Sequence, residues 1–310
     1  MIALPTQTAA GYAHPAYAAA MTHLGHTREL RACGGTLVER RIAGSERADA
    51  MGPYPIFACA HWDCLADDLA ALEGKLVSVT LVADPFGRWT PELLHAAFPE
   101  LARPYKQHLV TDLARPVAER LSKHHRKELR RASARQLEFH PCDSDERWVA
   151  EWCRLYANLV ERHHVSGPAA FSPESLAAQL AVPGARLVRA EHAGEVVAMS
   201  VWYRVGDVAV YHLAASSDAG YELGASYPLM YEALELFRAE GARWAHLGAG
   251  AGAHPGQADD GLTRFKFGWA TGSRAAWLCG RVLDRDAYAR LAPDHGSNDW
   301  FPAYRRGEVA

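Results

Sequence analysis

Three closely spaced strand patterns in the second half of the chain constrain the fold most. Residues 186–191, 195–204 and 208–215 are rich in apolar and β-branched side chains. The dipeptides Ala193-Gly194 and Gly206-Asp207 separate them, and such dipeptides are typical of tight hairpin turns. Strands joined by turns this short run antiparallel, because a parallel connection needs a dozen residues or more. The sequence therefore predicts an antiparallel meander.

Helices and further strands surround this meander. Three helical patterns precede it, and a loop, a helix, a strand, a second loop and a final strand near 276–283 follow it. In the first 115 residues, short strand patterns at 36–41, 54–59 and 76–83 alternate with helical ones. This mixture predicts the α/β (α+β) class. A chain of 310 residues has room for two domains.

The N-terminus and the cysteines indicate a cytoplasmic protein. The first 21 residues have neither a basic start nor a continuous apolar run, and no stretch of 18 apolar residues occurs anywhere. The six cysteines are scattered among apolar neighbours, which favours reduced thiols over a disulfide framework. Cys59, His61 and Cys64 lack a second ligand pair at zinc-site spacing, so we expect no metal.

Several common catalytic and nucleotide-binding motifs are missing. The chain has no GxxxxGK[ST] motif and no GxSxG nucleophile elbow. Gly248, Gly250 and Gly252 follow a predicted strand, but Ala253 replaces the next glycine that this dinucleotide fingerprint requires. These observations exclude the P-loop, serine-hydrolase and dinucleotide-binding interpretations.

One helix concentrates positive charge. Residues 120–135 contain seven Lys and Arg and one Glu, whereas the rest of the chain has 26 Lys and Arg against 35 Asp and Glu. The net formal charge of −3 therefore excludes a basic coat but conceals one cationic face. Helical spacing places five cations on that face: Lys123, Arg126, Lys127, Arg130 and Arg131. The face can bind phosphates; the alternative is an ordinary solvated helix.

Three further segments are candidates for chemistry. The predicted loop 218–226 enters a helix, whose N-terminal amides favour an anion, and Gly224 permits close approach. Lys266 lies between Phe265 and Phe267, where a half-buried cation can be aimed at a negative group. Asp84 ends a strand, where a carboxylate can hold or deprotonate an amine. The alternatives are a plain connection, a surface lysine and a turn-forming Asp-Pro.

Taken together, these segments resemble the GNAT acyltransferase superfamily, and most nearly its Fem-type branch. That branch includes aminoacyl-tRNA-dependent transferases of peptidoglycan bridges and of some antibiotics. The first segment that carries the resemblance, VTLVADPFG (79–87), matches weakly. The matching segments in the second half are LSKHHRKELRRA (121–132), AGEVVAMSVWYR (193–204), VYHLAASS (210–217), LGASYPLMYEAL (223–234), GARWAHLG (241–248) and GLTRFKFGW (261–269).

The resemblance implies tandem GNAT-like lobes, each with a mixed, mostly antiparallel sheet flanked by helices. We expect a degenerate lobe at 1–115, the acyltransferase domain at 116–285 and a peripheral tail at 286–310. The implied reaction is attack of an amine on an activated acyl carbonyl, without a metal or a tightly bound cofactor. The acyl donor is a co-substrate, and the acceptor is an amine of a small molecule or of a peptidoglycan or natural-product precursor.

The resemblance also assigns roles to residues. Lys266 would stabilise the oxyanion or a donor phosphate, and Asp84 would orient the acceptor amine. The expected donor-binding residues are Lys123, Arg126, Lys127, Arg130, Gly224 and Ser226, and the expected substrate-binding residues are Tyr211, His212, Tyr227 and Phe265.

One departure bears on the donor. Users of acetyl-CoA start their pyrophosphate loop with Gln or Arg, whereas this chain has Tyr221 followed by Glu222. An aminoacyl-tRNA donor is therefore slightly favoured over an acyl-CoA or carrier-protein thioester. The remaining alternative is a non-catalytic module that binds nucleic acid or a partner through the basic helix.

Overall fold

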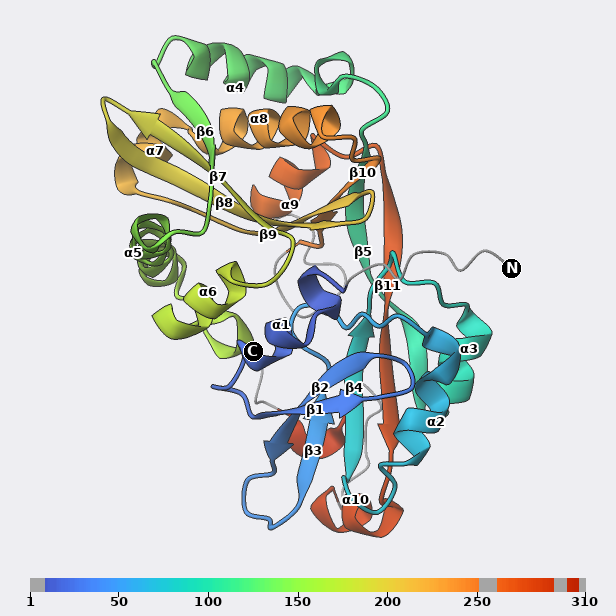
Figure 1. Cartoon of the computed structure of the whole chain (residues 1–310). Coiled ribbons are helices and arrows are strands. Elements are labelled where there is room, and N and C mark those ends of the chain that lie inside the picture. Colours follow the sequence, from blue (N-terminus) through green and yellow to red (C-terminus); the bar gives the residue numbers. More distant parts are fainter. Residues whose placement is uncertain (1–8, 251–260, 293–299, 307–310) are drawn as a thin grey trace. The chain divides into compact units, whose positions relative to one another are not determined.

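The computed structural model describes residues 9–250, 261–292 and 300–306, and these residues form two compact units. Unit 1 consists mainly of Gln107–Ser166 and Ser172–Arg274. Unit 2 consists mainly of Tyr12–Lys106 and of the segment that begins at Ala275. The units are thus interleaved along the chain rather than consecutive. Strands β5 (Leu101–Asp112) and β11 (Gly272–Val282) contribute residues to both (Figure 1).

The predicted meander is confirmed in unit 1. Its strands run antiparallel to their neighbours as β7 (Ala185–His192), β8 (Glu195–Val205) and β9 (Val208–Ser216). β6 (Glu138–Cys142) pairs with β7 at one edge, and β10 (Trp244–Gly248) lies between β9 and β5. Only the β9–β10 pair of unit 1 is parallel among the pairs described. The sheet is therefore mixed and mostly antiparallel, as expected.

The parallel pair β9–β10 diverges after a short contact. Its register covers three residue pairs, of which the last joins His246 to Val210. β9 then continues to Ser216, whereas β10 ends at Gly248, which has a positive φ of 73°. Neighbouring strands that stop pairing leave backbone groups without a ladder partner. The point of divergence is where the candidate site lies.

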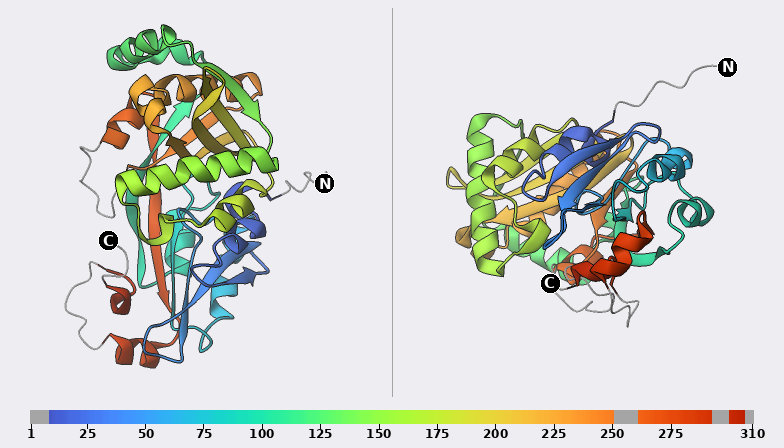
Figure 2. Two further views of the ribbon diagram at one scale, coloured as in Figure 1. Left: turned by 90° about the vertical axis from the view of Figure 1, so that its left-hand side faces the viewer. Right: turned by 90° about the horizontal axis from the view of Figure 1, so that it is seen from below.

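Helices cover both faces of the meander. α8 packs on the face that carries Trp202, and α5 and α6 pack on the face that carries Tyr203, whose hydroxyl donates to the Gln179 carbonyl at 3.0 Å. Consecutive strand residues point to opposite faces, so this alternation places a buried core on each side. Figure 2 shows α5 lying across its face. The helices of unit 1 are α4 (Lys123–Ser133), α5 (Glu146–His163), α6 (Pro173–Leu180), α7 (Asp218–Leu223), α8 (Ser226–Ala239) and α9 (Gly261–Phe267).

Unit 2 has the strand order β1-β2-β3-β4-β11-β5. The predicted strand 76–83 is confirmed as β4, but the predicted strand 54–59 is wrong, because there only Phe57 bridges to Ala83. Pro53 and Pro55 lack amide hydrogens, so this segment cannot form a regular ladder. The bounds are β1 (His26–Leu30), β2 (Gly35–Arg41), β3 (Ala48–Met51), β4 (Ser78–Ala83), α1 (Pro15–Ala19), α2 (Leu65–Ala70), α3 (Pro91–Ala97) and α10 (Arg285–Leu291).

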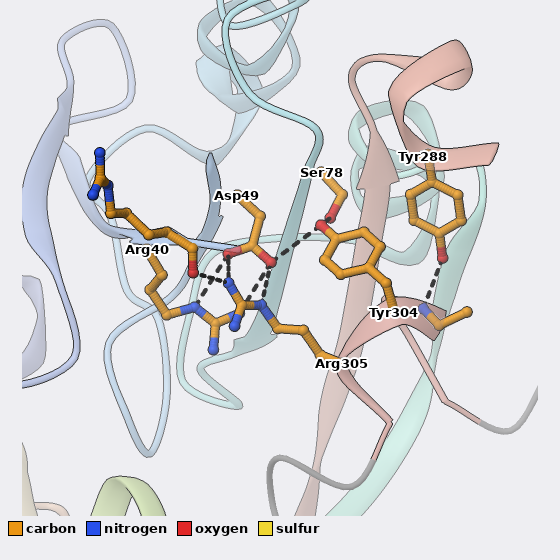
Figure 3. A network of polar contacts seen from close by, with 8 residues as sticks. Arg40, Asp49, Ser78, Tyr288, Tyr304 and Arg305 are labelled. Atoms are coloured by element: carbon orange, nitrogen blue, oxygen red, sulfur yellow. Dashed lines mark hydrogen bonds and ion pairs between the residues drawn. The ribbon is translucent and has the colours of Figure 1, made fainter. Parts of the chain in front are cut away.

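The described end of the chain packs inside unit 2. Asp49 is buried, and the Arg305 guanidinium donates to both of its carboxylate oxygens, at 2.5 and 2.9 Å. Arg40 and the Tyr304 hydroxyl donate to the same carboxylate (Figure 3). A buried carboxylate needs such partners, since desolvation disfavours its charge. The predicted peripheral tail, 286–310, therefore includes residues that complete a buried network.

The α/β class is confirmed, whereas the division into separate GNAT-like lobes stays a prediction. The second half of the glycine-rich loop, with Gly252 and Ala253, lies outside the described residues. No helix in the described ranges has the length and apolar character that crossing a bilayer requires.

Candidate functional site

Lys266 is buried beside the divergence of β9 and β10. Its side chain is on α9, and the residue is 8% exposed. The Nζ atom donates to the Ala249 carbonyl at 2.7 Å and lies 5.7 Å from the centre of the Tyr211 ring. A Cβ on Gly248 would lie 3.5 Å from Nζ, so the backbone approaches the amine closely. Three segments far apart in sequence thus converge on one ammonium group.

An aromatic cluster fixes α9 against α4 and α8. The His125 ring lies 4.6 Å from the Trp269 ring and 5.1 Å from the Tyr227 ring, and Tyr227 lies 5.1 Å from Phe265. His125 Nε2 also lies 2.8 Å from the Phe265 carbonyl oxygen. Burial lowers the pKa of His125, which favours the neutral ring that donates here. The two predicted substrate-binding residues Tyr227 and Phe265 are therefore brought together.

Gly268 is required by this packing. A Cβ at this position would lie 1.9 Å from Cε1 of His125, far inside van der Waals contact. His125 is 2% exposed and surrounded by rings, so it has little room to move. The glycine after the Phe-Lys-Phe segment thus allows α9 to approach α4.

Tyr211 and His212 lie on opposite faces of β9. Tyr211 packs 4.9 Å from the Trp202 ring on the Lys266 side. His212 Nε2 lies 2.7 Å from Oε1 of Gln179 on α6, and burial lowers its pKa to about 3. The structure therefore places Tyr211 beside Lys266 and does not place His212 there.

The cationic side chains of α4 point to solvent. Ser122 caps the helix as predicted, by accepting from the His125 amide at 3.1 Å. His125 and Ala132 are buried on the inner side. The exposed cations with no ion-pair partner in the described ranges are Lys123, Arg126, Lys127 and Arg130. Arg131 instead pairs with Glu128 at 2.8 Å.

The predicted loop 218–226 is wrong as a loop, because most of it is helix α7. The Ser217 hydroxyl caps this helix by accepting from the Gly220 amide at 3.1 Å, and Gly224 ends it with a φ of 60°. The amides of Gly224 and Ala225 donate to carbonyls of α7, at 3.1 and 2.9 Å. Arg135 donates to the Glu222 carbonyl at 3.0 Å. Ser226, at the start of α8, is exposed. These amides are thus engaged within the chain rather than arranged around an anion.

A buried histidine pair, which sequence reasoning missed, lies on β5 and β10. His108 Nδ1 and His246 Nε2 are 2.8 Å apart, and the residues are 6% and 2% exposed. Burial holds the pKa of His246 well below its usual value, and electrostatic interactions with His108 and Lys266 lower it further. The alternation of small and apolar residues on β10 indicated burial, but no local signal paired the two strands.

Asp84 lies in unit 2, at the end of β4. Its carboxylate accepts from the Phe86 amide at 2.9 Å, and its carbonyl accepts from Trp89 Nε1 at 2.7 Å. Its own amide donates to the Phe57 carbonyl at 2.9 Å. The position at a strand end is as predicted, and the local bonds are those of an Asp-Pro turn. Its catalytic role stays a prediction.

The described residues include a group of side chains that could hold a metal ion, although the sequence leads us to expect no metal. Glu138, His140 and Glu191 have ligand atoms within 4.8 Å of one another, on β6 and β7. Glu191 is already paired with Arg189 at 2.5 Å, which weakens it as a ligand. Cys59, His61 and Cys64 do not form such a group.

Comparisons with known proteins give a consistent fold. The chain is similar to FemX, with a TM-score of 0.66 at 12% identity over 89% of this chain and 92% of that one. It is also similar to L-PGS from Bacillus licheniformis, with a TM-score of 0.56 at 13% identity over 88% and 93%. A third similar structure is the C-terminal DUF2156 domain of a protein named as a lysylphosphatidylglycerol synthetase, from Agrobacterium fabrum, with a TM-score of 0.58 at 14% identity over 91% of both chains. No curated protein matches the chain in sequence.

A family match defines the central part of the chain. Residues 119–255 match the family described as "Acetyltransferase (GNAT) domain". This span contains α4, the meander, α8 and β10, and it excludes Asp84 and Lys266. The mixed sheet with its short parallel strand pair is consistent with this family match and with the fold likeness to FemX. Residues 119–255 of the chain are thus similar to a GNAT acetyltransferase domain.

Proposed function

We propose that the chain is an N-acyltransferase that transfers an aminoacyl group from aminoacyl-tRNA to an amine and forms an amide. The observation that carries this proposal is the buried ammonium group of Lys266 at the divergence of β9 and β10. A buried cation interacts strongly with a nearby negative charge, because little solvent screens the interaction. It suits a group that develops negative charge during a reaction.

In the proposed reaction, the nitrogen of a neutral amine attacks the carbonyl carbon of the aminoacyl ester. The C–N bond forms, and the carbonyl oxygen becomes an oxyanion that Lys266 stabilises. The C–O bond to the tRNA then breaks, the tRNA hydroxyl gains a proton, and the amine nitrogen loses one. Asp84 orients the acceptor amine. Positioning and charge stabilisation supply the catalysis.

Two observations favour tRNA as the donor. The four exposed cations of α4 have no acidic partners in the described ranges, and phosphates are the natural partners of such a face. The amides at the α7–α8 junction already donate to carbonyls of the chain, which leaves that junction poorly suited to a pyrophosphate. The fold likeness to FemX is consistent with this choice.

A second candidate donor is an acyl-CoA or carrier-protein thioester. The description of the matched family as an acetyltransferase domain favours it. In that case Lys266 keeps its role, and the cations of α4 bind the phosphates of the carrier. A non-catalytic binding module is the third candidate, and the burial of Lys266 beside the Tyr211 ring speaks against it.

The acceptor belongs to a class rather than to one compound. We propose an amine of a small molecule or of a peptidoglycan or natural-product precursor. The protein named as a lysylphosphatidylglycerol synthetase adds a lipid headgroup to the acceptors to be tested.

The test offers both donors to the same preparation. Charged tRNA carrying labelled amino acids and a mixture of acyl-CoA compounds are incubated separately with a panel of amines, with and without RNase. We expect labelled amide from charged tRNA only, and RNase abolishes it. Turnover of a thioester that is insensitive to RNase would eliminate the tRNA donor. Tight binding of charged tRNA by both wild type and Lys266→Met, with no transfer by either, would favour the binding module.

A further inference from the structure

A pocket in unit 1 has three arginines among its nine lining residues. It has a volume of about 420 Å³ and lies where β5 ends and β10 and β11 begin. Arg115, Arg120 and Arg274 contribute to its lining, and Asp112 is the acidic residue among the lining residues. The first two arginines precede α4 directly in sequence.

The carboxylate of Asp112 is already neutralised. It forms an ion pair with Arg243, and Oδ1 accepts from the Ala114 amide at 2.8 Å. Four arginines thus lie around one aspartate whose carboxylate is already paired. Like charges at this density repel one another, and a bound anion would relieve the repulsion.

Arg120 is held in place while part of its donor capacity is unused. Its two Nη atoms donate to the carbonyls of Asp112 and Arg115, the second at 3.1 Å. Its Nε atom is buried and has no hydrogen-bond partner within the described ranges. Burial lowers the pKa of Arg120, Arg115 lowers it further, and Glu119 and Glu235 raise it. The guanidinium is thus fixed at the lining of the pocket by its two carbonyl contacts.

The carboxylate of Glu235, which also acts on Arg120, is engaged in hydrogen bonds of its own. Glu235 accepts from the Val117 amide at 2.7 Å and from Arg238 at 2.6 Å. Arg243 and Arg274 lie over the Trp244 ring, at 4.8 and 5.3 Å from its centre. The ring therefore orients two cations rather than offering a bare face for an aromatic ligand.

We propose that this pocket binds phosphoryl groups that together carry two or more negative charges. The arginine forks match their oxygens, and the exposed Ser273 hydroxyl lies on the lining. The pocket is separate from Lys266: Trp244 and Gly248, at opposite ends of β10, are roughly 13 Å apart at an ordinary strand rise. These groups can be neighbouring phosphodiesters of an RNA backbone or can belong to a free phosphorylated metabolite. The inference does not rest on the proposed acyl transfer.

The probe is inorganic pyrophosphate, titrated calorimetrically into the full chain at constant ionic strength. Saturable binding to one site is expected. Arg115→Ala should weaken it about tenfold, because a charge-assisted hydrogen bond is lost. Arg186→Ala is the matched control, since Arg186 is also exposed but lies on β7. No saturable binding, or equal affinities for these two variants, would overturn the proposal.

A second pair of variants guards against misfolding. Ser273→Asp adds a negative charge at an exposed lining position and should reduce pyrophosphate binding more than tenfold. Ser144→Asp adds the same charge at another exposed position of unit 1 and should leave binding unchanged. Equal binding by the two variants would place the anion elsewhere and contradict the proposal.

A competition arm identifies the source of the phosphoryl group. A short single-stranded RNA that displaces pyrophosphate from the wild type, where a nucleoside diphosphate does not, indicates the RNA backbone. A nucleoside diphosphate that displaces it where RNA does not indicates a free metabolite. Either outcome supports the phosphoryl site. If neither the RNA nor the nucleoside diphosphate displaces pyrophosphate, the proposal is overturned.

Discussion

Lys266 and Asp84 lie in differently built surroundings, although the same resemblance predicts both to be catalytic. The neighbours of Lys266 come from β9, from the end of β10 and from its own helix. The carboxylate and carbonyl of Asp84 bond to groups within five residues of it. A turn explains the contacts of these two groups with Phe86 and Trp89, whereas no local motif explains why a lysine is buried. The comparison therefore gives Lys266 the stronger case for chemistry.

The largest expected effect comes from removing the Lys266 charge. Lys266→Met should lower kcat/KM for amide formation about 10²–10³-fold, because an oxyanion stabiliser is lost. Arg264→Met, on the same helix but exposed, should stay within about twofold of the wild type. Circular dichroism checks that both variants fold. A Lys266→Met variant that retains most of the wild-type rate would remove this residue from the mechanism.

The variant Asp84→Asn tests the second residue of this comparison. The Asn side-chain oxygen can still accept from the Phe86 amide, so the turn and the melting temperature should hold. The lost charge should lower the rate by about 10²-fold if the carboxylate orients the amine. Steady-state kinetics against acceptor concentration measures this effect. An unchanged rate would leave Asp84 with a purely local role.

Charge reversal on α4 tests whether binding is separate from chemistry. The double variant Lys127→Glu and Arg130→Glu should weaken tRNA binding at least about tenfold and reduce its salt dependence by about one per lost cation. Arg186→Glu is the control on a distant strand, and Lys266→Met should bind tRNA like the wild type. Filter binding at several salt concentrations gives the slopes. Equal slopes for the α4 variant and the Arg186 variant would rule out the basic face of α4 as the surface that binds tRNA.

The smallest effect concerns His212, which the structure places away from Lys266. Its pKa is about 3 in the folded chain and near 6.5 when unfolded, so only the unfolded chain takes up the proton between these values. The free energy of unfolding should therefore fall with decreasing pH, by at most about 1.4 kcal/mol per pH unit from this group. His212→Gln should flatten that dependence without a large loss of activity. Urea unfolding between pH 7 and 4 measures it, and an activity loss like that of Lys266→Met would return His212 to the site.

The sequence predicts the parts of the fold that local patterns determine. The meander with its two turn dipeptides, the strand β4 and the cap at Ser122 are all confirmed. The segment 54–59 looked like a strand because of its apolar residues, but Pro55 prevents the ladder. The prediction of a loop at 218–226 is wrong, because the Ser217 side chain caps a short helix over Asp218–Leu223.

Part of the candidate site depends on contacts that no short pattern encodes. The Phe-Lys-Phe segment and the basic helix were visible in sequence, but their junction through His125 and Gly268 was not. The His108–His246 pair joins residues 138 positions apart. Long-range contacts of this kind become visible only when the strands and helices are placed.

Amide formation from an aminoacyl-tRNA is the reaction that we propose for this chain. The most direct test is a single turnover with tRNA charged with a ¹³C-labelled amino acid, followed by the mass and fragmentation of the amine acceptor. We expect one labelled aminoacyl residue on the amine nitrogen of the acceptor. This product should be absent after RNase treatment and nearly absent with Lys266→Met. Release of the label only as free amino acid, or an RNase-insensitive product formed from a thioester, would contradict the proposed reaction.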